Sequence, residues 1–308
     1  MSILLANPRG FCAGVERAIS MVNLALQKYG APVYVKHEIV HNVHVVADLK
    51  AKGAVFIEEL LEIPKGSVVI FSAHGVSQAV QAEARALGLE IFDATCPLVT
   101  KVHVEVRRLH AQGYHIIMIG HAGHPEVEGT MGQVQGGVHL VESLADVHAL
   151  NFNLNEKLSY VSQTTLSVDD TKLIIEALKA KFPHIVPPRK DDICYATQNR
   201  QDAVRALTAQ SQVIVIVGSK TSSNANRLRE LAELNQIPAY LVDDEKELDP
   251  AWLKGKGNIG ISAGASTPEH LVQAVAAKAQ ALTHNSAPEN LQGINENMVF
   301  RVPSKLLD

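Results

Sequence analysis

Short apolar runs alternate with amphipathic stretches along most of the chain, and this alternation predicts an α/β fold. The apolar runs, rich in β-branched residues and followed by polar turns, indicate strands at 2–6, 33–40, 68–72, 91–93, 115–119, 158–162, 213–217, 239–242 and 258–262. The amphipathic stretches indicate helices at 13–29, 76–87, 97–112, 168–181, 195–210, 224–235 and 268–282. Regular alternation of this kind favours mainly parallel sheets.

The three cysteines occupy equivalent places in this pattern. Cys12, Cys96 and Cys194 each follow a short strand or turn and precede an amphipathic helix. A sulfur at the N-terminus of a helix is favoured as the thiolate by the helix dipole. A polar cluster follows each cysteine, at 40–42, 120–126 and 218–224, and the spacing to His41, His124 and Ser222 within them is 29, 28 and 28 residues.

A second polar cluster follows in each copy, between an apolar strand and a helix: SAHGVS at 72–77, SQTTLS at 162–167 and SAGAST at 262–267. The chain is therefore expected to contain three similar α/β lobes and a tail that forms a loop and one extended strand, with bounds 1–96, 97–193, 194–282 and 283–308. Ligands of open α/β sheets bind beyond the carboxyl ends of the strands. Three lobes around a pseudo-threefold axis would direct three thiolates and six polar turns at one centre.

Composition narrows the class of protein. Apolar residues make up 46% of the chain and charged residues 19%, and the formal net charge is −4. These values are typical of a globular protein and give no sign of a nucleic-acid or membrane surface. The absence of an 18-residue apolar run and of a signal-peptide pattern predicts a cytoplasmic protein. An odd number of cysteines, three, argues against a disulfide framework.

Thiolates select zinc or iron–sulfur clusters. The chain has no C-x2-C pair of the kind that structural zinc sites use. Three widely spaced cysteines suit one [4Fe–4S] cluster in which a single iron keeps an open position. Zinc held by the cysteines and a histidine stays an alternative.

Residues 37–41 also match the zinc motif H-E-x-x-H. We interpret this match as false, because that motif needs a helix and the surrounding residues favour a strand. No P-loop and no G-x-G-x-x-G motif is present, which disfavours ATP hydrolysis and dinucleotide binding.

The polar clusters indicate that the protein binds an anionic ligand. Turns at helix N-termini expose N–H groups that bind phosphate, and His41, His74 and His124 would add donors or positive charge. Glu126, two residues after His124, is a candidate proton source, with Glu128 as its rival. The hydroxyls of Thr164 and Thr165 could relay or hold a proton.

Long motifs now carry a family resemblance. The chain resembles the 4-hydroxy-3-methylbut-2-enyl diphosphate reductases, which complete the non-mevalonate route to isoprenoids. The resemblance covers nearly the whole chain and rests on PRGFCAGVERAI, HNV, SAHGVS, DATCPLVTKVH, GHAGHPEVEGT, SQTTLSVDDT, KDDICYATQNRQ, GSKTSSNANRL and SAGASTP.

The resemblance implies a cluster and a set of site residues. It implies a [4Fe–4S] cluster with one open iron, held by the three cysteines. It implies Glu126 as the proton donor, with Thr164 near the substrate hydroxyl. It implies a diphosphate site formed by His41, His74, His124, Ser222, Ser223, Asn224 and Ser266.

The reaction implied is a reduction by two electrons and two protons, which removes the allylic hydroxyl as water. The products would be isopentenyl and dimethylallyl diphosphate. Reduced ferredoxin or flavodoxin would supply the electrons to a monomer. Two other functions fit the same ligands: an iron–sulfur hydro-lyase, which needs no external reductant, and a redox-sensing protein whose cluster is only a signal.

Overall fold

The chain divides into two compact units. The computed structural model describes residues 2–153, 155–284 and 286–307, so the outermost ends of the predicted first lobe and tail, Met1 and Asp308, lie outside the described residues. Unit 1 comprises Met1–Glu16, Val40–Ala47 and Tyr195–Val299, and unit 2 comprises Arg17–Ile39, Asp48–Cys194 and Phe300–Asp308. Each ladder between the described strands is parallel.

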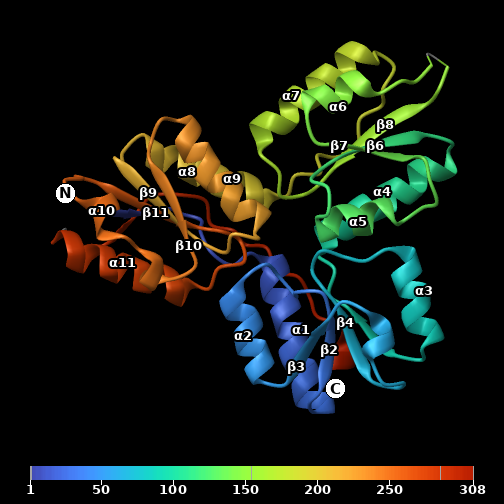
Figure 1. Cartoon of the computed structure of the whole chain (residues 1–308), viewed down its shortest axis with the longest axis horizontal. Coiled ribbons are helices and arrows are strands. Elements are labelled where there is room, and N and C mark those ends of the chain that lie inside the picture. Colours follow the sequence, from blue (N-terminus) through green and yellow to red (C-terminus); the bar gives the residue numbers. More distant parts are fainter. Residues whose placement is uncertain (1, 154, 285, 308) are drawn as a thin grey trace. The chain divides into compact units, whose positions relative to one another are not determined.

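Unit 1 is built on one five-stranded sheet in the order β10-β9-β11-β1-β12. Its strands are β1 (Ile3–Leu5), β9 (Val213–Val217), β10 (Ala239–Val242), β11 (Ile259–Ala263) and β12 (Glu289–Asn290). Its helices are α8 (Tyr195–Thr208), α9 (Ser223–Leu234), α10 (Pro250–Leu253) and α11 (Glu269–Thr283), with the 3-10 turn η2 (Glu245–Glu247). Alternate residues of β9 pack against α11 on one face and against α8 and α9 on the other (Figure 1).

Strand β1 lies in this sheet and not with the strands of the predicted first lobe. Leu4 is in register with Gly260 of β11 on one side and with Glu289 of β12 on the other. The apolar run at the N-terminus identifies a buried strand, but it does not specify which strands will be its neighbours.

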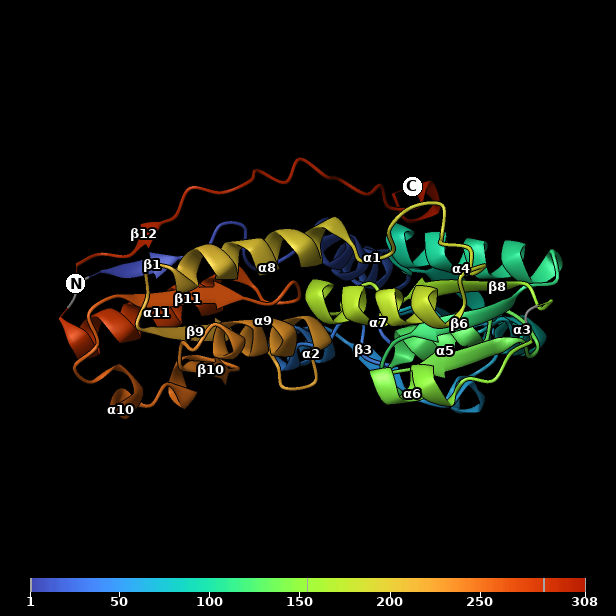
Figure 2. The same ribbon diagram turned by 90° about the horizontal axis from the view of Figure 1, so that it is seen from above.

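The tail also differs from the prediction of one extended strand. Only Glu289–Asn290 pairs, as β12, and residues 291–303 have no regular structure before the 3-10 turn η3 (Ser304–Leu306). In Figure 2 this segment leaves β12 and runs along α8.

The first sheet of unit 2 has the order β3-β2-β4-β5. Its strands are β2 (Val33–Lys36), β3 (Ala54–Ile57), β4 (Val68–Phe71) and β5 (Glu90–Asp93). The neighbouring elements in the chain are α1 (Ala13–Tyr29), α2 (Val43–Ala51), α3 (Gln78–Ala86) and the 3-10 turn η1 (Leu60–Glu62), of which α1 and α2 begin within unit 1. Residues of α3 and η1 pack on one face, and Tyr29 of α1 contacts Phe92 of β5, with 5.7 Å between ring centroids.

The second sheet of unit 2 has the order β7-β6-β8. Its strands are β6 (His115–Ile119), β7 (Val138–Val141) and β8 (Leu158–Ser162). Its helices are α4 (Pro97–Ala111), α5 (Pro125–Met131), α6 (Leu144–Ala149) and α7 (Val168–Lys181). Helices α4 and α5 cover one face and α6 and α7 the other. The three parallel sheets with their helices confirm the predicted α/β class, and the arrangement about a central cluster stays a prediction.

The segment around the H-E-x-x-H match is neither helix nor a long strand. Strand β2 ends at Lys36, so the prediction of a strand through 40 was wrong beyond that residue. His37 has a positive φ of 62°, which ends the extended run. Residues 37–42 contain no helical turn, so the two histidines of the motif lack the helical spacing that a zinc protease requires. No helix among the described residues has the length and apolar character of a membrane span.

Two glycines let α5 approach the turn after β4 closely. A Cβ on Gly129 would lie 3.0 Å from the carbonyl oxygen of Gly75, and one on Gly132 would overlap the side chain of Ser77. The buried amide of Gln133 completes this contact, donating to the carbonyls of Val76 and Gly129 at 2.9 and 2.7 Å. The position of α5 is therefore fixed by backbone contact.

We expect Gly129→Ala to destabilise the protein although it raises helix propensity. The gain of about 1 kcal/mol expected in a helix interior is outweighed by the clash with the Gly75 backbone, for a net loss of about 1–2 kcal/mol. Urea unfolding would measure the change in free energy. Gly257→Ala serves as the control, because its new methyl would meet only the flexible Gln212 side chain. A Gly129→Ala protein as stable as the wild type would contradict the close contact.

Candidate active site

Cys96 lies where two neighbouring strands of unit 2 end. It follows β5 and is the N-cap of α4, with Pro97 as the first helical residue. Its backbone N–H donates to the carbonyl of Ala73, in the turn after β4, at 3.0 Å. The cysteine is thereby held beside the turn that carries His74.

Two of the predicted diphosphate ligands meet at this turn. The rings of His74 and His124 are in edge-to-face contact, with centroids 5.7 Å apart. Ser72 lies next to His74, with 3.2 Å between its hydroxyl and Nδ1. His124 is the N-cap of α5, and its Nδ1 accepts from the N–H of Glu126 at 3.1 Å. Two imidazoles and the start of α5 therefore lie together.

Glu126 and Thr164 are bonded to one another. The N–H of Thr164 donates to one carboxylate oxygen of Glu126 at 2.6 Å, and its hydroxyl donates to the other at 3.0 Å. Both residues are buried. The carbonyl of Thr164 accepts from the N–H of Cys194 at 3.1 Å. Unit 2 thus connects Cys194 to the predicted proton donor through one residue.

The environment of Glu126 favours its protonated form. Burial raises the pKa of this carboxyl to about 7, the two hydrogen bonds from Thr164 oppose the shift, and the charge of Asp192 adds to it. The pKa of Asp192 is itself raised by burial, against the attraction of Lys101, whose Nζ lies 3.2 Å from its carboxylate. A carboxyl that is half protonated near neutral pH suits a proton donor.

Unit 1 places Cys12 against the turn that follows β11. The N–H of Cys12 donates to the carbonyl of Ala265 at 3.2 Å. The N–H of Ala265 in turn donates to the side-chain oxygen of Asn224 at 2.9 Å. Ser266 donates from its hydroxyl to the carbonyl of His41 at 2.9 Å. Four of the predicted site residues therefore gather at this turn.

The start of α9 supplies the remaining predicted ligands. Ser222 is the N-cap, and its hydroxyl accepts from the N–H of Ala225 at 3.3 Å. Ser223 is the first helical residue and Asn224 the second. The buried amide of Asn224 lies 3.4 Å from the hydroxyl of Thr197. The N-terminal N–H groups of a helix of this length form a favourable environment for an anion.

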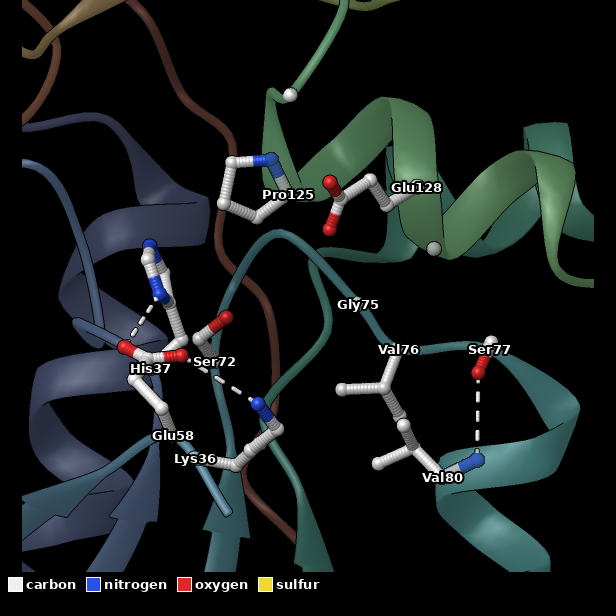
Figure 3. Close-up of a pocket in the computed structure, with 12 residues that line it drawn as sticks. Lys36, His37, Glu58, Ser72, Gly75, Val76, Ser77, Val80, Pro125 and Glu128 are labelled. Carbon is white, nitrogen blue, oxygen red and sulfur yellow. Dashed lines mark hydrogen bonds and ion pairs between the residues drawn. The ribbon is translucent and has the colours of Figure 1, made fainter.

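A cavity of about 260 Å³ borders the His74 turn in unit 2 (Figure 3). Its wall carries both charge signs, from Lys36, Glu58 and Glu128, and includes the imidazole of His37. Glu58 is paired with His37 at 2.9 Å and with Lys36 at 3.4 Å. None of the predicted diphosphate ligands is among its lining residues, but His37 in its wall contacts His74, with 6.0 Å between ring centroids, so the cavity adjoins the predicted site.

Some contacts of the site were not predicted from the sequence. Asp192, two residues before Cys194, accepts from the N–H of Ser162 at 3.1 Å and so joins the cysteine segment to the end of β8. Thr197 supports Asn224. The acidic pair before the cysteine was a visible signal for Asp192, whereas nothing local distinguishes Thr197 from other helical threonines.

The donor set matches a thiolate-bound metal group. The three cysteines are half-buried and form no disulfide. Each directly precedes a helix, because α1, α4 and α8 begin at Ala13, Pro97 and Tyr195. Thiolate sulfurs in this setting are suited to zinc or an iron–sulfur cluster and not to a hard cation such as magnesium.

A family model described as LytB protein matches residues 3–280. The chain belongs to this family. It is 62% identical over 304 residues to a 4-hydroxy-3-methylbut-2-enyl diphosphate reductase of Azoarcus sp. (strain BH72), covering 99% of this chain and 97% of that protein. A protein of the same name from Chromobacterium violaceum is 60% identical over 305 residues, covering 99% and 98%.

Solved structures agree with this assignment. The E-1-hydroxy-2-methyl-but-2-enyl-4-diphosphate reductase from Plasmodium falciparum matches with a TM-score of 0.96 at 42% identity, covering 99% of this chain and 96% of that one. A second structure, of (E)-4-hydroxy-3-methyl-but-2-enyl diphosphate reductase, matches with a TM-score of 0.65 at 34% identity, covering 91% and 100%. The resemblance inferred from the motifs is confirmed.

We expect Glu126 to make the stability of the metal-free protein depend on pH. Its folded-state pKa of about 7 lies above the ordinary value of 4.5, so the folded chain binds this proton more tightly than the unfolded chain. The contribution is full below pH 4.5 and is lost as the pH rises through 7, a change on the order of 3 kcal/mol.

Urea unfolding at pH 5 and pH 8 would measure this dependence. In Glu126→Gln the part of the stability loss between pH 5 and pH 8 that is due to this carboxyl should vanish. Glu128→Gln, at an exposed position of the same helix, should lose as much stability as the wild type. Equal pH dependence in the wild type and Glu126→Gln would refute the raised pKa.

Proposed function

We propose that this protein reduces (E)-4-hydroxy-3-methylbut-2-enyl diphosphate to isopentenyl and dimethylallyl diphosphate, with release of water. The proposal rests on the similarity of nearly the whole chain to proteins named 4-hydroxy-3-methylbut-2-enyl diphosphate reductase. The reaction consumes two electrons and two protons, breaks the allylic C–O bond and leaves the diphosphate intact. An external donor, ferredoxin or flavodoxin, would supply the electrons to a cytoplasmic monomer.

We infer that Cys12, Cys96 and Cys194 together hold one [4Fe–4S] cluster with one iron lacking a protein ligand. The support is chemical: three thiols outside disulfides, each next to a helix start, in a chain without a fourth cysteine. When bound, such a cluster would supply electrons and a Lewis-acidic iron for the substrate hydroxyl.

The diphosphate would be held by the helix start and the histidines. Ser222, Ser223 and Asn224 supply hydroxyl, amide and backbone N–H groups at the N-terminus of α9. His41, His74 and His124 add ring N–H donors, and Ser266 adds a hydroxyl. Several donors on one diphosphate fix the orientation of the hydroxymethyl end, which lowers the entropic part of the barrier.

Glu126 would deliver the proton on which loss of water depends. Its carboxyl has a pKa of about 7, so a large fraction is protonated at neutral pH and able to donate from an oxygen. Thr164 contacts both carboxylate oxygens and orients the group through its N–H and hydroxyl. Burial of this pair keeps bulk water from competing for the proton.

We expect anaerobically purified protein to contain about four irons and four sulfides per chain, following the ligand count. Iron and acid-labile sulfide assays, with EPR of the reduced protein, would measure this. Turnover of the allylic diphosphate should require an added reductant. One zinc per chain after anaerobic preparation, or dehydration of the substrate without a reductant, would overturn the reductase assignment.

We expect Glu126→Gln to retain the cluster and substrate affinity but to lose turnover by about 10²-fold or more, because an amide cannot donate the proton. The matched comparison is Glu128→Gln, which makes the same change at the exposed position two residues on. Single-turnover and steady-state rates would be measured for both. Loss of activity in Glu128→Gln instead would assign the proton to that residue.

A further inference from the structure

Arg200 is the largest fully buried side chain among the described residues. Its Nε and Nη2 donate to the carbonyl of Gly10 at 3.0 and 2.7 Å, and Nη2 also lies 3.2 Å from the carbonyl of Phe11. Nη1 donates to the carbonyl of Ala196 at 2.9 Å. A guanidinium on α8 is therefore hydrogen-bonded to both residues that precede Cys12.

The charge of this buried guanidinium is compensated from the tail. The carboxylate oxygens of Glu296 lie 3.0 and 3.2 Å from Nη1 of Arg200, and the amide of Asn199 donates to Glu296 at 2.9 Å. Burying an arginine costs little only when its N–H groups and its charge both have partners. Glu296 lies in the segment that Figure 2 shows running along α8.

Backbone contacts hold the tail next to the loop that precedes Cys12. The N–H of Leu291 donates to the carbonyl of Leu5 at 2.9 Å. Gly293 passes so close to Asn7 that a Cβ would overlap the Asn7 carbonyl. The tail thus reaches Glu296 along a fixed path.

The turn after β11 holds the opposite side of the loop. The N–H groups of Gly10 and Cys12 donate to the carbonyls of Ala263 and Ala265 at 3.4 and 3.2 Å. Gly10 has a φ of 66°, and a Cβ there would lie 3.0 Å from the carbonyl oxygen of Thr267. The Cys12 loop therefore uses its N–H groups toward β11 and its carbonyls toward Arg200.

We propose that Arg200 and Glu296 are positioning residues that fix the Cys12 loop for cluster binding. Neither is assigned a contact with the substrate, and both act through the carbonyls of Gly10 and Phe11. The inference deepens the proposed function, because it takes Cys12 as a cluster ligand. Under this proposal the irregular tail helps to position a residue of the site through Glu296.

The test is Glu296→Gln in the full-length chain, which keeps the shape of the side chain and removes the compensating charge. In metal-free protein, alkylation by iodoacetamide would be followed at each cysteine by mass spectrometry. We expect Cys12 to react roughly tenfold faster than in the wild type, because local opening of its loop becomes easier. Cys96 and Cys194, which belong to unit 2, should keep their wild-type rates.

A second readout uses anaerobically prepared holoprotein. Iron release to a chelator should be correspondingly faster in Glu296→Gln. Gly293→Ala provides an independent variant, because it displaces the tail without altering Arg200 or Glu296, and it should give the same Cys12-specific change. Glu289→Gln, the same charge change at an exposed tail position, should behave as wild type.

Wild-type alkylation of Cys12 in both Glu296→Gln and Gly293→Ala would overturn the proposal. So would equal acceleration at all three cysteines, which would indicate general destabilisation. The alkylation measurement needs no cluster and no turnover, so its failure is distinguishable from failure of the reductase assignment. That assignment is tested on the wild-type protein alone.

Discussion

Parallel strand pairing is the constraint on which the arrangement within each unit depends. Strands β4 and β5 are neighbours, so the turns that follow them bring His74 beside Cys96. Strands β6 and β8 are neighbours as well, and the turns after them bring Glu126 to Thr164. In unit 1 the loop of Cys12 meets the turn after β11 because β1 and β11 pair. Each of these three contacts joins separate segments whose strands end at one edge of a sheet.

The polar interior of each unit is satisfied by specific partners rather than by solvent. Burial of Glu126 is tolerated because Thr164 saturates both carboxylate oxygens, and the remaining cost appears as a raised pKa. Burial of Arg200 is tolerated because loop carbonyls and Glu296 take its N–H groups. In both cases the groups that compensate the buried charge belong to, or contact, a segment that carries a cysteine. Because such a network is satisfied in only one arrangement, it makes the fold specific as well as stable.

The sequence predicted the long helices and most strands, because periodicity and polar turns are local signals, and the roles assigned to the site residues stay predictions. It missed α2, α5, α6 and α10, which are short and carry little periodicity. It could not assign β1 to its sheet, since register and neighbours are set by distant strands. The burial of Arg200 was not predicted, because it depends on contacts with a loop 190 residues earlier. The bond between Glu126 and Thr164 likewise joins two named residues whose contact no local pattern encodes.

The position of β1 has a consequence for the order of assembly during synthesis. The segment before Cys12 is completed by β11, by Arg200 and by Glu296, all of which are translated long after it. The sheets of unit 2 draw their strands only from residues 33–162, so they can form while the remainder is still being translated. Strand β1 therefore pairs only after β11 has been translated. The Cys12 loop can consequently reach its final structure only after residue 296 has been made, far later in synthesis than the loop itself.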